Sequence, residues 1–246
     1  MSRSCYQARS AETDADVEAA QRLRYRAFIA GTGAAPRPEG RDADAYDAIC
    51  THILIEDSAG ALVATFRLLP LTSGEDIAQC YSAQYYDLDA LRAYDKPMVE
   101  MGRFCVAPGR VDPDILRVAW GAVTSFVDRE EVGLLFGCSS FHGTDTQAYA
   151  DAFAMLKERH LAPRRWLPRI KAPNVFRFAQ RLRGKPDRKR ALKTMPPLLR
   201  SYLTMGGWVS DHAVVDTDLN TLHVFTGLEI RAIPPARARA LRAVAG

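Results

Sequence analysis

One stretch constrains the fold of this chain more than any other, because it combines the pattern of a buried strand with two charges. Residues 99–106 read Val-Glu-Met-Gly-Arg-Phe-Cys-Val, a composition that favours a central β-strand. A buried charge is costly without a partner, so Glu100 and Arg103 should each be paired. Regular pleating places them on opposite faces, and a bulge near Gly102 would bring them together. We predict that this strand is the floor of a reaction cleft, with a purely structural Glu–Arg pair as the alternative.

Length and composition fit one globular domain. The chain has 246 residues, of which 48% are hydrophobic and 25% charged. It has no apolar run of the roughly 20 residues that span a bilayer. We predict a single domain over residues 1–246, with a core of about 1–180 and a basic C-terminal extension of about 181–246 packed on it. No apolar segment follows the first residues, so we expect no signal peptide and a cytoplasmic location.

The cysteines indicate reduced thiols. They are odd in number and widely spaced, at positions 5, 50, 80, 105 and 138. This arrangement does not fit a disulfide framework and agrees with a cytoplasmic location. The chain has no Cys-x-x-Cys pair and its histidines are scattered, so we expect no metal site.

A one-sided run of positive charge lies between Lys157 and Lys193. It contains fourteen Lys or Arg residues against only Glu158 and Asp187. We call residues 157–193 the basic segment. Such a segment attracts an anionic partner, which is a nucleic acid, an anionic lipid or an acidic protein. A solvated basic face without a partner is the alternative.

The order of the predicted elements indicates an α/β fold with a mixed, mostly antiparallel sheet flanked by helices. We expect strands at residues 6–9, 51–56, 61–69, 99–106, 134–138 and 221–228, and helices at 17–29, 113–129, 144–160, 196–205 and 236–244. Asp14 is the expected cap of the first helix, and Pro113 fits the first turn of the second. The excursion at residues 70–96 carries Tyr81, Tyr85 and Tyr86, which we expect to be half-buried.

Four motifs in order resemble those of acyl-homoserine-lactone synthases. They cover about eighty residues and read Arg24-x-x-x-Phe28, Asp44-x-x-Asp47, Arg67-Leu-Leu-Pro70 and Glu100-x-x-Arg103-Phe104. Each motif alone is a weak signal, whereas the four in order are specific. The resemblance implies the fold of GCN5-related N-acetyltransferases and an acyl-transfer activity.

The second half of the chain is more similar to a sister group, the ornithine-acyl-carrier-protein N-acyltransferases that make lyso-ornithine lipid in bacteria. Its matching stretches lie at residues 136–143, 160–163, 196–203 and 213–216. The resemblance therefore extends over nearly the whole chain. It implies transfer of a 3-hydroxyacyl chain to the α-amine of ornithine, with glutamine or lysine as other acceptors and a homoserine-lactone synthase as the enzymatic alternative.

Moving an acyl group from a thioester to an amine requires a base, close positioning and a donor for the oxyanion. Glu100 is the expected base, acting directly or through water. Burial would raise its pKa and Arg103 would lower it, so the sequence leaves the balance open. Backbone N–H groups from Phe104 to Val106 are expected to hold the thioester oxygen. Cys105 should face away from Glu100 as a core residue.

The substrate-binding residues follow from the first three motifs. Asp44 and Asp47 are expected to hold the cationic amines of a diamino acid, and Arg67 with Arg103 to clamp its carboxylate. The resemblance adds Arg24 and Phe28 to this group. A solvated acidic loop is the alternative for the two aspartates.

The acyl donor is expected to be acyl carrier protein. Residues 107–113 contain one glycine and two prolines, and lack the glycine-rich loop that cradles the pyrophosphate of coenzyme A in related enzymes. The phosphopantetheine of a carrier protein has a single phosphate, so we expect no bound cofactor. The acidic carrier would dock on the basic segment at Arg181, Arg183, Arg188 and Arg190. The last predicted helix is also basic, which leaves peripheral contact with the anionic inner membrane open.

Two other functions fit the residues less well. A nucleic-acid-binding protein would also need the basic segment, but the segment has few aromatic residues and no recognition motif, so we expect no nucleic-acid partner. A serine hydrolase using Ser139 or Ser140 with His142 would need a Gly-x-Ser-x-Gly turn, which this region does not have.

Overall fold

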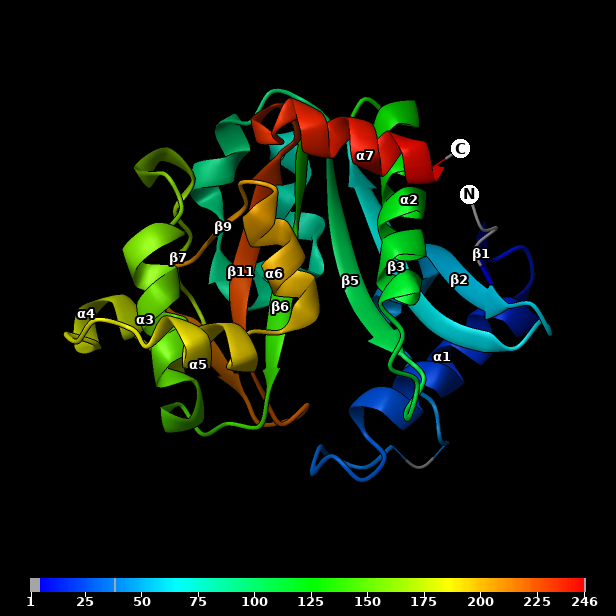
Figure 1. Cartoon of the computed structure of the whole chain (residues 1–246), viewed down its shortest axis with the longest axis horizontal. Helices are drawn as coiled ribbons and strands as arrows, with labels where there is room; N and C mark the ends of the chain where they lie inside the picture. The colour runs from blue at the N-terminus through cyan, green and yellow to red at the C-terminus, as the bar shows by residue number, and fades with distance from the viewer. Residues whose placement is uncertain (1–4, 38, 246) are drawn as a thin grey trace. The chain divides into compact units, whose positions relative to one another are not determined.

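A computed structural model of the chain describes residues 5–37 and 39–245 (Figure 1). The chain forms two compact units. Unit one consists of Met1–Pro70, Met101–Val132 and Pro235–Gly246, and unit two consists of Leu71–Glu100 and Gly133–Pro234. Residues 181–234 belong to unit two and the last helix belongs to unit one, while the single domain over residues 1–246 with a basic extension stays a prediction.

Unit one contains four neighbouring strands in the order β1-β2-β3-β5. Their bounds are Tyr6–Ser10 for β1, Thr51–Asp57 for β2, Leu62–Leu71 for β3 and Met98–Val106 for β5, of which unit one takes the part from Met101. Strands β2 and β3 form the expected antiparallel hairpin. Leu54 and Ile55 point to opposite faces and are both buried, so the sheet is covered on both sides.

Three helices surround these strands: α1 (Asp14–Phe28), α2 (Pro113–Arg129) and α7 (Pro235–Ala245). Both α1 and α2 pack on β2. Helix α2 has the predicted bounds, with Asp112 as its cap and Pro113 in its first turn. The cap of α1 is Thr13 and not Asp14, because Thr13 and Asp16 form a reciprocal capping box.

Unit two is built on a pair of long antiparallel strands, β6 (Leu134–His142) and β11 (Thr221–Glu229). The first residues of β5, Met98–Glu100, pair in parallel with Leu134–Phe136 of β6. Beyond β11 follow β10 (Ala213–Asp216) and β8 (Val175–Phe176), while β9 (Trp208–Val209) pairs with β11 and β4 (Tyr86–Asp87) pairs with β7 (Arg169–Ile170). The mixed, mostly antiparallel sheet is confirmed.

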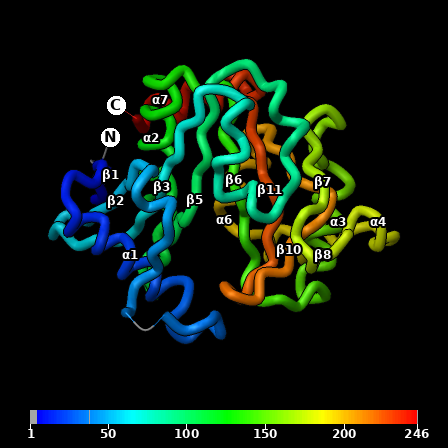
Figure 2. The backbone as a smooth tube through the Cα atoms, turned by 180° about the vertical axis from the view of Figure 1, so that it is seen from behind, coloured from blue at the N-terminus to red at the C-terminus, as the bar shows by residue number. Residues whose placement is uncertain are grey.

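Helices and turns cover both faces of β6 and β11. Helix α6 (Pro197–Thr204) packs on one face, and residues 71–97 pass over the other (Figures 1 and 2). Residues 71–97 contain 3-10 turns, of which η3 (Tyr81–Gln84) contacts β6. Tyr81 and Tyr85 are half-buried as expected, but Tyr86 is fully buried because its ring lies against Phe225 and its hydroxyl donates to the His223 carbonyl.

The remaining helices of unit two are α3 (Ala150–Arg159), α4 (Phe178–Arg181) and α5 (Arg188–Thr194). Helix α3 begins six residues after the predicted start, since residues 147–149 form a 3-10 turn first. Their shared core includes Phe153, which stacks on Phe178 at 5.2 Å between ring centroids. Among the described helices, none has both the length and the apolarity needed to cross a membrane.

Candidate active site

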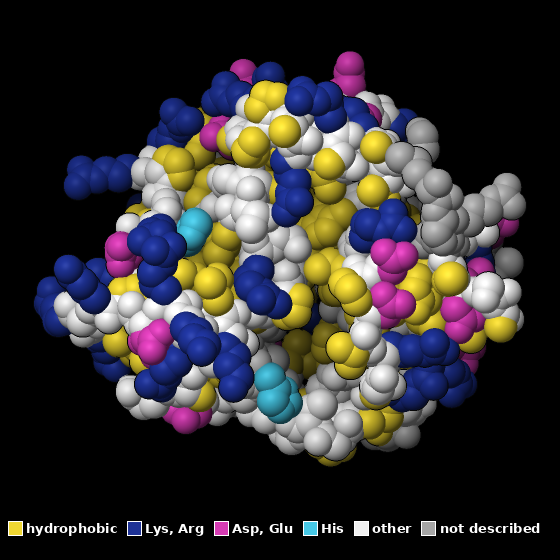
Figure 3. Space-filling view, viewed as in Figure 1, with side chains coloured by type: hydrophobic (Ala, Val, Ile, Leu, Met, Phe, Trp, Pro, Cys, Tyr) yellow, Lys and Arg dark blue, Asp and Glu magenta, His cyan; other side chains and the backbone are white. Residues whose placement is uncertain are grey.

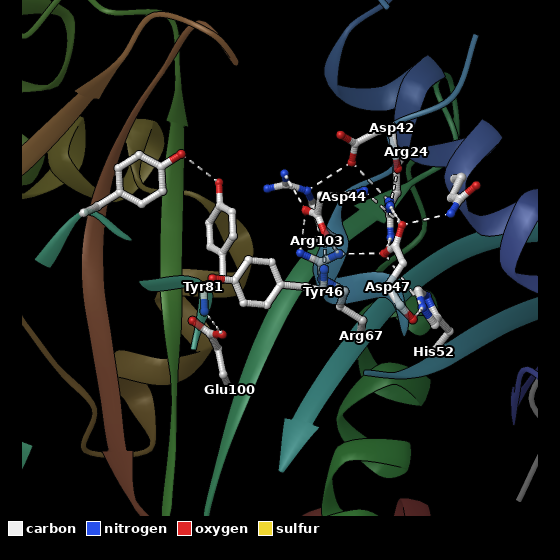
Figure 4. A network of polar contacts seen from close by, with 12 residues as sticks. Arg24, Asp42, Asp44, Tyr46, Asp47, His52, Arg67, Tyr81, Glu100 and Arg103 are labelled. Carbon is white, nitrogen blue, oxygen red and sulfur yellow. Dashed lines mark hydrogen bonds and ion pairs between the residues drawn. The ribbon is translucent and has the colours of Figure 1, made fainter. Parts of the chain in front are cut away.

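Six charged residues of unit one form a connected network that we call the ion-pair cluster (Figure 4). Helix α1 contributes Arg24, the loop after it contributes three aspartates, β3 contributes Arg67 and β5 contributes Arg103. The members are Arg24, Asp42, Asp44, Asp47, Arg67 and Arg103. Five of these residues belong to the sequence-predicted site, so the structure brings them together as expected.

Arg24 holds the loop to helix α1. Its Nη1 and Nη2 donate to the two carboxylate oxygens of Asp47, each at 2.8 Å. Its Nη2 also donates to the backbone carbonyl of Asp42, and its Nε lies 3.1 Å from Asp42 Oδ2. Only 1% of the Arg24 side chain is exposed. A bidentate pair of this kind is both strong and geometrically specific.

Arg67 and Arg103 hold the same loop from the strands. Arg67 binds both oxygens of Asp44, at 2.6 and 2.8 Å, and reaches Asp47 Oδ1 at 2.6 Å. Arg103 Nε donates to Asp42 Oδ2 at 3.0 Å, and its Nη2 donates to Asp44 at 3.3 Å. Both strand arginines therefore bind aspartates, so the partners of Arg103 include the acidic loop.

The loop geometry follows from its own sequence. Asp44 is the N-cap of the 3-10 turn η1 (Ala45–Ala48), and its Oδ1 accepts from the Tyr46 N–H at 2.9 Å. Asp47 completes a capping box by accepting from the Asp44 N–H. The Asp-x-x-Asp spacing thus serves two purposes, because each carboxylate caps the turn and binds an arginine.

The arginines control the protonation of the aspartates. Burial alone would raise the pKa of Asp44, but the hydrogen bond and charge of Arg67, together with the charge of Arg103, lower it. The pKa of Asp47 is likewise lowered, since Arg24 and Arg67 outweigh its burial. A carboxylate with a depressed pKa contributes stability above its unfolded value of about 4, and this contribution is lost as the pH falls further. Burial lowers the pKa of the neighbouring His52, which favours a neutral imidazole at pH 7.

The cluster is balanced in charge, and its members differ in exposure. Three aspartates face three arginines, and Arg24, Asp42, Asp47 and Arg67 have side chains at most 8% exposed. Asp44 and Arg103 are more accessible, at 25% and 12%. The deep residues therefore hold the loop in place, while Asp44 and Arg103 are the most accessible members of the cluster.

Glu100 lies in unit two, on the first part of β5, and is only 4% exposed (Figure 4). Its Oε2 accepts from the Tyr81 N–H at 2.8 Å. Its Oε1 accepts from the Ser82 N–H at 2.7 Å and from the Ser82 hydroxyl at 2.5 Å. These donors open the 3-10 turn η3, whose N-cap residue Cys80 provides no side-chain cap. Glu100 therefore caps this turn from a distant strand, and the three hydrogen bonds favour its ionised form.

Two neighbours of Glu100 respond to its charge. The pKa of the Cys80 thiol is raised well above its usual value, first by burial and then by Glu100. The pKa of Tyr202 on α6 is raised for the same two reasons. Both groups are therefore neutral at pH 7, so neither competes with Glu100 for a proton.

The remaining predicted residues of β5 follow an unusual backbone conformation at Arg103. Arg103 has φ of +55°, the left-handed region that side-chain-bearing residues rarely adopt. The irregularity therefore falls one residue beyond Gly102. Phe104 and Val106 are half-buried, and the Phe104 ring lies 6.1 Å from that of Phe66. Cys105 is buried as expected, and burial raises the pKa of its thiol to about 12.

The charged side chains of the basic segment are almost all exposed. Of its Lys and Arg residues, only Lys157 is half-buried, and positive side chains gather over α4 and α5 in unit two (Figure 3). Within the part of the chain that the structure describes, Arg181, Arg183 and Arg188 form no ion pair, whereas Arg190 lies 3.3 Å from Asp151. The first three arginines therefore carry charge that is not neutralised locally.

The serine-hydrolase alternative finds no support in unit two. Ser139 is buried and accepts a hydrogen bond from Thr226 at 2.9 Å. His142 is exposed at the end of β6, and its carbonyl accepts from the Tyr149 hydroxyl.

Phe28, which the resemblance added to the substrate-binding residues, is the last residue of α1 and is half-buried.

Sequence reasoning missed two residues that bind the predicted site residues directly. Asp42 joins Arg24 and Arg103, and its presence in the same acidic loop was the available signal. Ser82 holds Glu100 across 18 positions of the chain, and no local pattern indicates this contact. Cys80 does not cap the turn η3 with its side chain, but the sequence does not show that a turn begins there.

Comparison with known proteins places these residues in a family. An acetyltransferase (GNAT) domain model matches residues 23–121, which include the whole ion-pair cluster and Glu100. The chain is 34% identical to an L-ornithine N(alpha)-acyltransferase of Rhodobacter capsulatus, over 93% of this chain and 91% of that protein. It is also 34% identical to a protein of the same name from Brucella abortus, over 92% of this chain and 84% of that protein.

Solved structures support the fold. An N-acyl amino acid synthase from uncultured soil microbes, FeeM, matches with a TM-score of 0.52 and 12% identity, over 98% of this chain and 96% of that one. The CoA-dependent acyl-homoserine lactone synthase BjaI also gives a TM-score of 0.52, with 15% identity over 97% of this chain and 88% of that one. The GNAT-like fold expected from the motifs is confirmed. The chain belongs to the L-ornithine N(alpha)-acyltransferase family and is an acyl-transferring enzyme.

Proposed function

We propose that this enzyme transfers a 3-hydroxyacyl chain from acyl carrier protein to the α-amine of ornithine, giving lyso-ornithine lipid. The similarity to L-ornithine N(alpha)-acyltransferases along more than nine-tenths of the chain carries this proposal. The amine nitrogen attacks the thioester carbonyl, the carbon–sulfur bond breaks, and the phosphopantetheine thiol leaves with a proton.

Glu100 is our candidate for the base that removes the proton of the attacking ammonium, directly or through water. Its burial and its hydrogen bonds to Tyr81 and Ser82 support this role, because they fix the carboxylate in one orientation and keep it charged. We assign the stabilisation of the oxyanion to backbone N–H groups from Phe104 to Val106. The left-handed conformation of Arg103 supports this assignment, since it redirects the backbone that follows.

The two most exposed members of the ion-pair cluster, Asp44 and Arg103, suit a diamino acid. The Asp44 carboxylate is suited to the side-chain ammonium of ornithine, and the Arg103 guanidinium is suited to its carboxylate. Arg24, Arg67 and Asp47 would not bind the substrate directly but would hold the acidic loop in place. Phe28 would contribute an apolar contact to the substrate. This division follows from the exposed fractions, which are largest for Asp44 and Arg103 within the cluster.

An assay with defined substrates tests the acceptor and the donor together. Purified enzyme is incubated with 3-hydroxyacyl carrier protein and, separately, ornithine, lysine, glutamine or homoserine, and products are read by mass spectrometry. We expect N-acyl ornithine as the main product. Asp44→Asn should raise the KM for ornithine more than it lowers kcat, because Asp44 binds charge away from the reacting bond. A preference for glutamine or an unchanged KM would contradict the proposed acceptor site.

The basic segment is our proposed docking surface for acyl carrier protein. Helix α5 presents Leu192, which is 48% exposed, between exposed residues that include Arg188 and Lys193. An apolar side chain within a positive rim fits an acidic protein surface, and complementary charge mainly raises the association rate. The exposed basic helix α7 would add peripheral contact with the anionic inner membrane.

Charge reversal tests this docking surface. We expect the combined variant Arg181→Glu, Arg183→Glu and Arg188→Glu to lower kcat/KM for the carrier protein by about tenfold or more at low salt. Arg190 is reversed separately, because its pair with Asp151 also supports the fold. The difference from wild type should shrink as salt screens the field.

The matched control reverses three exposed arginines outside the segment, Arg26, Arg37 and Arg92, with the same change in net charge. If both triple variants behave alike, the effect is one of net charge and the segment is not the docking surface. Anionic lipid vesicles can be added as a competitor of the carrier protein. If they lower kcat/KM for the wild type but not for the triple variant of the basic segment, α4 and α5 also bind lipid.

A further inference from the structure

The 3-10 turn η3 places one side chain directly on the Glu100 carboxylate. Ser82 is fully buried, and both its N–H and its hydroxyl donate to Glu100 Oε1, at 2.7 and 2.5 Å. On the other side, Ser82 Oγ lies 3.3 Å from Cys138 Sγ. A serine hydroxyl has one proton, and in this arrangement the carboxylate receives it.

We propose that Ser82 is a positioning residue for the acyl transfer, which keeps Glu100 ionised and in a fixed orientation through its hydroxyl hydrogen bond. The inference rests on the proposed role of Glu100 as the base. It goes beyond that role, because it assigns control of the base to residues 71–97, a segment in which neither the sequence motifs nor the family comparison marks a functional residue.

The physical argument concerns which form of Glu100 the surroundings favour. Glu100 is 4% exposed, and burial without donors would favour the neutral acid, which cannot accept a proton. The N–H groups of Tyr81 and Ser82 are fixed by the turn and remain in any variant at position 82 that preserves the backbone. The Ser82 hydroxyl is therefore the donor that a substitution can remove while the turn stays capped.

The other charged and titratable groups that face Glu100 do not replace this donor. Cys80 and Tyr202 are neutral at pH 7, since burial and the charge of Glu100 raise the pKa of both. Cys138 contacts the Ser82 oxygen, with its Sγ 3.3 Å from Ser82 Oγ, and carries no hydroxyl that could take the place of the serine donor. Loss of the hydroxyl thus leaves the carboxylate less stabilised, and more of it is protonated at a given pH.

The test is the pH profile of kcat/KM for the acyl transfer. Ser82→Ala should move the midpoint of the acidic limb upward by about one pH unit, the scale of one charge-assisted hydrogen bond. Below the midpoint this corresponds to about a tenfold lower rate, with little change at high pH. Ser82→Cys keeps the size of the side chain and weakens the donor, so it should shift the midpoint in the same direction and serves if Ser82→Ala does not fold.

Two variants separate the possible outcomes. Cys138→Ala removes the second neighbour of the Ser82 oxygen and should leave the midpoint in place. Glu100→Gln tests the base itself, and wild-type turnover in that variant would remove the proposed role of Glu100. If Glu100→Gln is inactive but Ser82→Ala and Ser82→Cys both keep the wild-type midpoint, Ser82 only packs the turn and our inference is wrong.

Discussion

Glu100→Gln is expected to lower the turnover number by about 10²-fold or more, the usual effect of losing a general base. The amide keeps the size of the side chain, and its single oxygen can accept from one of the two N–H groups, of Tyr81 or Ser82, that the carboxylate binds through separate oxygens. It cannot take a proton from the attacking ammonium. The measurement is kcat with saturating ornithine and acyl carrier protein, alongside a circular dichroism spectrum and a melting temperature.

The fold is the control for this prediction, because Glu100 also caps η3. A melting temperature far below that of the wild type would indicate that lost capping contributes to the lower activity. In that case Glu100→Asp, which keeps the charge and shortens the side chain, separates the two roles. A folded Glu100→Gln enzyme with wild-type turnover would show that another group is the base.

Arg24→Met should reduce the free energy of unfolding by about 3 kcal/mol, which makes it the largest expected effect on stability. The variant removes both hydrogen bonds to Asp47 and the contact with the Asp42 carbonyl. Breaking a buried ion pair leaves the partner charge uncompensated, and such changes typically cost 3–5 kcal/mol. We take the lower end, because Asp47 retains Arg67 and Gln21 as partners.

Arg22→Met provides a matched control on the same helix. Arg22 pairs with Glu18 one turn earlier, but its side chain is 59% exposed, so its loss should cost less than about 0.5 kcal/mol. Urea unfolding at pH 7 measures both variants. The contribution of the cluster should also diminish as the pH falls below about 4, because the folded-state pKa values of Asp44 and Asp47 are depressed. Equal losses for the two variants would mean that burial does not matter here.

The parts of the fold that local chemistry determines were predictable. Helix α2 has the predicted bounds, because two adjacent residues with a strong helix-start preference, Asp112 as the cap and Pro113 in the first turn, mark where it begins. The hairpin of β2 and β3 was likewise visible as two apolar runs around a turn. Strands β8 and β9 were not, because two residues cannot show a period of two. The division into two units was also hidden, as the chain returns to unit one only at Pro235.

The site shows the same limit more sharply. The motifs identified which residues carry charge, but not which residues they bind. Arg24 and Asp47 are 23 positions apart, and Ser82 and Glu100 are 18 apart, so their pairing depends on tertiary packing. The bulge near Gly102 stays a prediction, and the unusual backbone that the structure shows in this strand is the left-handed φ of Arg103. The finding that the aspartates bind arginines and also cap a turn required the structure.

The left-handed backbone at Arg103 has an evolutionary consequence. Glycine or asparagine would adopt this conformation at a lower cost, whereas a residue such as arginine pays about 1–2 kcal/mol. Neither residue would supply the forked guanidinium that reaches both Asp42 and Asp44. Lysine would retain the charge without the fork, at the same backbone cost. The position therefore faces two independent demands that no single residue meets in full: arginine supplies the fork and bears the backbone cost. Its replacement requires a second, compensating change in the acidic loop.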